Sequence, residues 1–152
     1  MSATDTTVVR LERTFDAPAG EVFDAWTNPE VLRRWWKAEP EGTVPVAEVD
    51  LREGGSYRLA MQNPGSEQTH TVRGRYVRVA RPELLEYMWA WELDDGSVGE
   101  ESTVVVRFHA DGDRTNVVLE HSGLPTPDSR EKHGHGWNGC LDSLGRIYPQ
   151  AG

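Results

Sequence analysis

Residues 13–36, RTFDAPAGEVFDAWTNPEVLRRWW, combine the end of a strand, two short helices and two adjacent tryptophans. Pro18 suits the first turn of a helix, because its φ is preset and an N–H would find no helical partner there. Asn28 followed by Pro29 predicts a second helix start, since the Asn side chain can accept a hydrogen bond from a free backbone N–H. The stretch therefore predicts a strand followed by two helices that meet at a tight corner.

Alternation of apolar and polar residues predicts strands on both sides of this stretch. Residues 7–15 precede the helical corner and alternate along their whole length. Beyond it, a period of two returns at about residue 44 and continues to about 122, interrupted by Gly, Pro and Asp signals but by no helical pattern. The expected strands are residues 44–50, 55–62, 69–80, 83–93, 101–110 and 114–122. Together they predict an antiparallel meander, with a bulge near Arg78 where the alternation changes phase.

The last segment predicts one long helix. Thr126 followed by Pro127 is typical of a helix start, and the helical pattern continues to about Arg146. Its inner face is predicted from spacings of three and four to hold His133, Trp137, Leu141, Leu144 and Tyr148. Three glycines within the helix cost helix stability, so close packing against a strand or the small helices is the expected reason for Gly134, Gly136 and Gly139.

Length and composition predict one globular domain. The chain has 152 residues, of which 37% are hydrophobic and 27% charged. We expect a mobile N-terminal tail at residues 1–7 and a domain over residues 8–150. No apolar run approaches the ~20 residues of a membrane-spanning helix, and no secretion signal is apparent, so a cytoplasmic location is expected. The single cysteine, Cys140, cannot form an internal disulfide.

The net charge of −9 argues against nucleic-acid binding, because an acidic surface repels the phosphate backbone. Basic residues come closest together at Arg73, Arg75, Arg78 and Arg81. These arginines could form an anion-binding stripe, but a solvated outer sheet face is the ordinary alternative.

The order of motifs resembles the START-like SRPBCC superfamily, and within it the branch related to the C-terminal domain of the activator of heat-shock protein 90 ATPase. The motifs that carry the resemblance are Asp16-Ala17-Pro18, Trp26-Thr27-Asn28-Pro29-Glu30, Trp35-Trp36, Gly54-Gly55-x-Tyr57 and Gly136-Trp137. The resemblance implies an α+β helix-grip fold, in which a curved seven-stranded antiparallel sheet holds two short helices and a long C-terminal helix in the order β-α-α-β-β-β-β-β-β-α. Such domains usually enclose a cavity.

Strand phase indicates which residues would face that cavity. Leu85, Tyr87, Trp89, Trp91 and Leu93 share one face of their strand, and the long helix adds residues opposite them. The expected ligand-binding residues are Trp35, Trp36, Tyr57, Met61, Tyr87, Trp89, Trp91, His121, Trp137 and Leu141. Aromatic stripes on a sheet more often fill a core, and that alternative stays open. We expect a small apolar or aromatic ligand and no cofactor.

An enzymatic function in the same cavity is the first alternative. His121 is the best candidate for a catalytic acid or base, with Tyr87 or Tyr57 as its partner, but an acid, base and nucleophile set is missing from the sequence. Cyclase, dehydratase and hydrolase activities belong to particular branches of the superfamily. No metal site is expected, since His133 and His135 are two apart on a helix and point in different directions.

A protein-interaction role is the second alternative. The resemblance implies a possible co-chaperone activity, but in the eukaryotic co-chaperone a separate N-terminal domain binds the chaperone. With few residues before the first predicted strand, we expect no such domain here. A homodimer through exposed apolar surface is also possible from the sequence.

Overall fold

The computed structural model describes residues 8–37, 39, 41–93 and 95–148. The expected tail at residues 1–7 and the end of the expected domain at 149 and 150 lie outside the described residues. The elements in chain order are β1 (Val9–Phe15), α1 (Ala19–Thr27), α2 (Pro29–Trp35), β2 (Thr43–Val49), β3 (Ser56–Gln62), β4 (Thr69–Ala80), β5 (Leu84–Trp91), β6 (Ser102–Asp111), β7 (Arg114–Ser122) and α3 (Pro127–Ile147). This order confirms the predicted α+β helix-grip arrangement.

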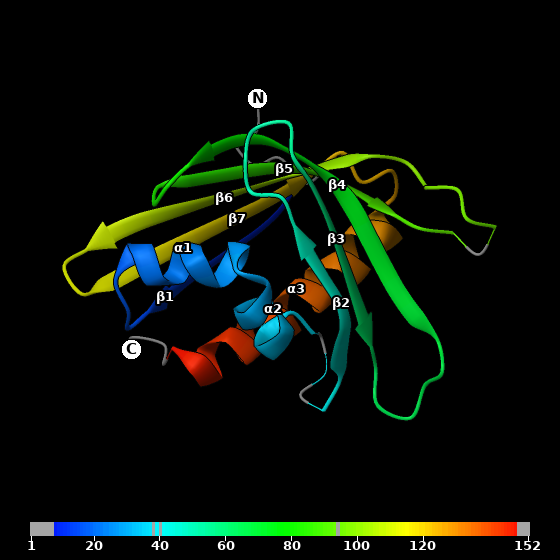
Figure 1. The fold of residues 1–152 in the computed structure, drawn as a ribbon, viewed down its shortest axis with the longest axis horizontal. Coiled ribbons are helices and arrows are strands. Elements are labelled where there is room, and N and C mark those ends of the chain that lie inside the picture. The colour runs from blue at the N-terminus through cyan, green and yellow to red at the C-terminus, as the bar shows by residue number, and fades with distance from the viewer. Residues whose placement is uncertain (1–7, 38, 40, 94, 149–152) are drawn as a thin grey trace.

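The seven strands form one antiparallel sheet in the order β1-β7-β6-β5-β4-β3-β2. Consecutive strands from β2 to β7 are neighbours, as a meander requires, and β1 pairs with β7 at the far edge. The predicted bulge is confirmed, because the register between β4 and β5 shifts between Tyr76 and Arg78. Figure 1 shows how strongly the sheet curves and how α3 crosses its open side.

Side-chain caps explain where α2 and α3 begin. The Asn28 side chain accepts a hydrogen bond from the Glu30 N–H (2.9 Å), with Pro29 at the first helical position. The Thr126 hydroxyl accepts from the Ser129 N–H (3.0 Å), again followed by proline. Both caps follow the sequence prediction, because a cap depends on residues only two or three apart.

The core lies between the sheet and the three helices. Phe15, Phe23, Trp35, Leu85 and Leu119 are fully buried there, and α3 adds Trp137, Leu141 and Leu144. Arg13 ties α3 to the edge strand β1, since its guanidinium donates to Asp142 and to Asn138, each at 2.8 Å. These contacts hold α3 across the sheet.

The prediction that glycines serve close packing is wrong for Gly136. A Cβ atom built at Gly136 would meet no neighbouring heavy atom within 4 Å, apart from the helix's own backbone. At Gly134 it would lie 3.7 Å from a Val9 methyl group, which is ordinary contact. Gly136 therefore leaves space beside α3 rather than bringing the helix closer to the sheet.

Candidate functional site

A cavity of about 770 Å³ lies between the N-terminal half of α3 and strands β3, β4 and β5. Four of the six tryptophans line it, namely Trp36, Trp89, Trp91 and Trp137. The other lining residues are Glu39, Met61, Asn63, His70, Asp128, Glu131, Lys132, His133, His135, Gly136 and Cys140. The volume and the mainly apolar surface with polar groups at its margin are typical of small-molecule sites.

Trp89 lies at the centre of the aromatic wall. Its ring centroid is 5.3 Å from that of Trp91 in a T-shaped pair, 5.1 Å from that of Trp137, and 6.1 Å from that of Trp36. Such separations and tilted geometries are those that aromatic rings prefer. The buried Nε1–H of Trp89 has no hydrogen-bond partner among the described residues. An unpaired buried donor is uncommon in a folded protein.

His133 joins α3 to the end of β5. Its Nδ1 lies 2.7 Å from the Ser129 carbonyl oxygen, and its Nε2 lies 2.9 Å from Trp91 Nε1. Because the carbonyl can only accept and the indole N–H can only donate, Nδ1 carries the proton and Nε2 accepts. Burial lowers the pKa of His133, although the bond to Ser129 opposes that shift. The imidazole at the cavity wall is therefore held neutral.

His121 lies deeper and is fully buried. Trp137 Nε1–H donates to its Nδ1 (3.1 Å), so the ring proton is on Nε2, which lies 2.7 Å from Ser102 Oγ. Burial, and secondarily the neighbouring His133, lower the pKa of His121 to about 3. The predicted partners of His121 are wrong: Ser102 and Trp137 hold the ring, not Tyr87 or Tyr57.

The Ser102–His121 pair resembles a nucleophile and its base only in distance. In a serine nucleophile pair the base accepts the hydroxyl proton on Nε2, and a carboxylate accepts from its Nδ1–H. Here an indole donates to Nδ1, so Nε2 is the protonated nitrogen and donates to Ser102. Ser102 is also only 4% exposed, so its hydroxyl is shielded from solvent. The geometry gives His121 a structural role.

The structure divides the sequence-predicted site residues into two groups. Five of them, Trp36, Met61, Trp89, Trp91 and Trp137, lie on the cavity wall. The other five, Trp35, Tyr57, Tyr87, His121 and Leu141, do not line it and are buried in the core. Strand phase correctly placed Tyr57, Tyr87 and His121 on the inner face of the sheet. The helices α1 and α2 cover one end of that face and leave the other open.

Tyr57 and Tyr87 belong to the covered end. With Trp26, Leu32 and Tyr76 they surround a residual space of only about 10 Å³. The ring centroids of Tyr57 and Tyr87 are 5.3 Å apart in a T-shaped pair, and Tyr57 Oη–H donates to the Met88 carbonyl (2.6 Å). Trp35 is buried nearby, against Trp26 at 4.6 Å. These aromatics fill a core.

Several lining residues were missing from the predicted set. His133 had been assigned to the inner face of the long helix, and His70 shares the phase of the buried Val72, so both carried a periodicity signal. Glu39, Asn63 and the first turns of α3 carried none, because loop and rim positions depend on how the elements meet in space. Within the described ranges, no three His, Cys, Asp or Glu side chains group as a metal site.

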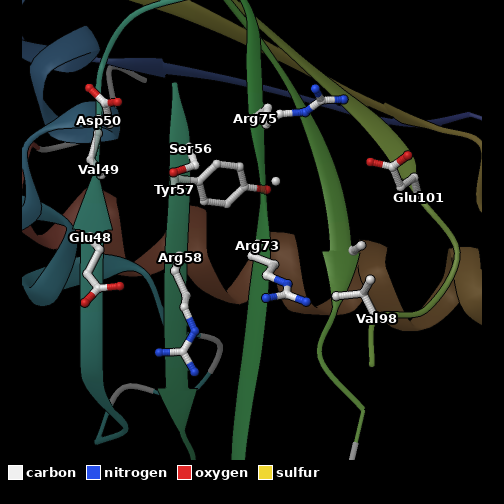
Figure 2. Close-up of a pocket in the computed structure, with 12 residues that line it drawn as sticks. Glu48, Val49, Asp50, Ser56, Tyr57, Arg58, Arg73, Arg75, Val98 and Glu101 are labelled. Atoms are coloured by element: carbon white, nitrogen blue, oxygen red, sulfur yellow. The ribbon is translucent and has the colours of Figure 1, made fainter. Parts of the chain in front are cut away.

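A second hollow, of about 590 Å³, lies on the outer face of the sheet (Figure 2). Its charged lining residues are Glu48, Asp50, Arg58, Arg73, Arg75 and Glu101. Arg58 makes two hydrogen bonds to Glu92, at 2.7 and 3.0 Å, and Arg73 lies 3.9 Å from the same carboxylate. Carboxylates lie on both sides of the arginines (Figure 2), and Arg58 is already bonded to Glu92, which favours a solvated outer face over an anion site.

The family model described as "Activator of Hsp90 ATPase homolog 1-like protein" matches residues 16–148. The chain belongs to this family. A relative from Dictyostelium discoideum, "Activator of 90 kDa heat shock protein ATPase homolog", is 26% identical over 134 residues, which are 87% of this chain and 30% of that protein. The chain thus spans less than a third of the length of this curated family relative.

Solved structures with this fold include bacterial and eukaryotic proteins. The AHSA1 protein from Silicibacter pomeroyi is 26% identical with a TM-score of 0.83, and the match covers 92% of this chain and 96% of that one. An HSP90 activator from Plasmodium falciparum is 22% identical with a TM-score of 0.72, covering 95% and 99%, and this likeness shows the fold alone. Over the described residues, no helix has both the length and the hydrophobicity needed to cross a membrane.

Proposed function

We propose that this protein binds a small hydrophobic or aromatic molecule in the cavity beside the N-terminal half of α3. The observation that carries the proposal is the 770 Å³ cavity with four tryptophans in its wall. A core built only for stability would place side chains into such a volume, because protein interiors are normally close-packed. At Gly136 the chain instead has no side chain toward the open space.

The test is a titration of the purified protein with fatty acids, sterols, flavonoids and small polyketides, followed by tryptophan fluorescence and by thermal melting. A ligand that binds the folded state raises the melting temperature as its concentration increases. Because four tryptophans line the cavity, binding there also changes their emission. Analysis of the ligand after incubation separates binding from catalysis, since a binding protein returns it unchanged.

A pair of variants at one position assigns the binding to this cavity. Gly136→Leu places a side chain in the open space. It is expected to weaken binding at least about tenfold, because the leucine occupies cavity volume and displaces the ligand from its apolar contacts. Gly136→Ala is the matched control, because it removes the same glycine but leaves nearly all of the volume. Equal affinities in both variants, or no binding across the panel, would contradict the proposal.

Family membership supports a second proposal, that the protein acts on a chaperone ATPase of the Hsp90 type. The match covers only 30% of the length of the Dictyostelium relative, so we state a shared activity as a proposal. The test is the ATPase rate of a purified Hsp90 with and without this protein, together with an affinity measurement of the complex. An unchanged rate and no complex would count against this function.

A further inference from the structure

The charged groups around the cavity are mainly carboxylates. Glu39, Asp128 and Glu131 line its rim, whereas Lys132 is the one lysine or arginine among the lining residues that the structure describes. Lys132 Nζ already lies 3.1 Å from the Asp128 carboxylate. Over the same described part of the chain, Glu39 and Glu131 make no ion pair. The rim therefore carries excess negative charge.

The two histidines bonded to the wall tryptophans, His133 and His121, offer no positive charge to an anion in the cavity. His133 is neutral, with its Nδ1–H donated to Ser129 and its Nε2 accepting from Trp91. His121 is buried behind the wall with both nitrogens bonded. A carboxylate or phosphate in the cavity would lose its hydration and gain no charged partner among these groups, which is costly. Anionic ligands are disfavoured by the groups around this cavity.

The tryptophans favour the opposite charge. Indole faces attract cations more strongly than other aromatic faces, especially where water is excluded. Trp89 and Trp91 are nearly perpendicular, at 87°, while Trp89 is inclined by 43° to Trp137 and by 56° to Trp36. Rings at such angles present several faces and edges to the same hollow. The net charge of −9 also raises the local concentration of cations.

We infer that the ligand of this cavity is a hydrophobic or aromatic amine that carries a positive charge. Its apolar part lies among Trp89, Trp91 and Trp137, and its ammonium group faces the rim carboxylates Glu39 and Glu131. The inference rests on the proposed function, because it assigns a chemical class to the molecule bound in the same cavity. It goes beyond that function by assigning the charge of the ligand.

The test compares three probes of nearly equal size by isothermal titration calorimetry. They are 2-(1-naphthyl)ethylamine, which is a cation, 2-(1-naphthyl)ethanol, which is neutral, and 1-naphthylacetate, which is an anion. The amine is expected to bind about tenfold more tightly than the acetate at low ionic strength, with the alcohol between them. This preference should shrink as salt is added, since exposed charges are screened over about 8 Å at physiological ionic strength.

Rim variants identify the groups that cause the preference. In the double variant Glu39→Gln and Glu131→Gln, the amine is expected to lose several-fold affinity while the alcohol keeps its own. The matched control is Asp111→Asn with Asp113→Asn, which changes the net charge equally. These two residues lie in and beside the β6–β7 turn, at the opposite end of the molecule from the start of α3 (Figure 1). The control should leave the order of the three probes unchanged.

The outcomes separate this inference from the proposed function. If the acetate binds as tightly as the amine or more tightly, the inference is overturned, while the bound alcohol still supports ligand binding. If the control lowers amine affinity as much as the rim variant, the rim carboxylates are not the cause and the assignment is overturned. If none of the three probes binds, a cavity for aromatic molecules is contradicted, and this inference with it.

Discussion

The two ends of the inner sheet face use the same kinds of residue to opposite effect. At the end covered by α1 and α2, hereafter the filled end, the aromatics leave about 10 Å³ between Trp26, Leu32, Trp36, Tyr57, Leu59, Tyr76, Leu85 and Tyr87. At the end beside the N-terminal half of α3, hereafter the hollow end, about 770 Å³ stays open. Aromatic content is therefore a poor guide to whether a region is core or site.

The covering elements explain the difference. The filled end receives large side chains from two helices, including Trp26 from α1 and Leu32 from α2. The hollow end is covered by one helix, which at Gly136 has no side chain to place into the space. Trp36 follows α2 and borders both regions. We expect substitutions in the filled end to affect stability and those in the hollow end to affect binding.

The largest effect is expected from Trp35→Ala. Trp35 is fully buried at the filled end, where its Nε1–H donates to the Ala25 carbonyl (2.8 Å). Removing the ring should lower the free energy of unfolding by about 3–5 kcal/mol. Urea denaturation measures this loss. Trp91→Ala is the control at the hollow end, where the ring is only partly buried, and equal losses in both variants would contradict the comparison.

The next largest effect is expected from Gly74→Ala at the filled end. The added Cβ would overlap the Met88 carbonyl oxygen and lie 3.1 Å from a Tyr57 ring carbon. The backbone must move to relieve this clash, so the free energy of unfolding should fall by about 3 kcal/mol. Chemical denaturation measures it against Gly99→Ala, whose nearest neighbours lie 3.8 Å away. A neutral Gly74→Ala would show that the strands separate more easily than their packing indicates.

Acid is expected to destabilise the protein through His121, which is buried behind the cavity wall against Trp89 and Trp137. Its pKa is about 3 in the folded state, against about 6.5 when unfolded. Between these values the unfolded chain binds a proton that the folded chain does not, so stability falls as pH decreases below 6.5. The contribution is about 1.4 kcal/mol per pH unit, or about 2 kcal/mol at pH 5.

Denaturation at several pH values measures this contribution. The control is His121→Gln, which is expected to be less stable at neutral pH but to lose less stability on acidification. Comparison of the two proteins removes the effect of the carboxylates, which titrate in both. Parallel pH profiles for the two proteins would mean that His121 does not carry the expected proton linkage.

The smallest effect is expected from Gly136→Ala in the hollow end, and its sign is opposite. Alanine raises helix stability by about 0.5–1 kcal/mol over glycine, and the added methyl group meets open space. Thermal melting should therefore show a small increase. Gly54→Ala is the contrasting variant, because its φ of +84° strains any side chain and should lower the melting temperature. A loss of stability in Gly136→Ala would show that the space is not open.

Local signals predicted most of the fold, and five of the ten expected ligand-binding residues line the cavity. Caps such as Asn28 and Thr126 depend on neighbours in sequence, and strand phase correctly assigned Trp89 and Trp91 to the inner face. The partners of His121 were not predictable in this way. Ser102 and Trp137 come from β6 and α3, and only the packing of both against β7 brings them to the ring.

The sequence by itself determined the element order, the inner and outer faces of the strands and the face of the long helix. It could do so because periodicity and capping are set by residues a few positions apart. Only the tertiary structure decided which part of the aromatic face is core and which part is cavity. That outcome depends on where α1, α2 and α3 cover the curved sheet, and on the volume that their side chains leave there.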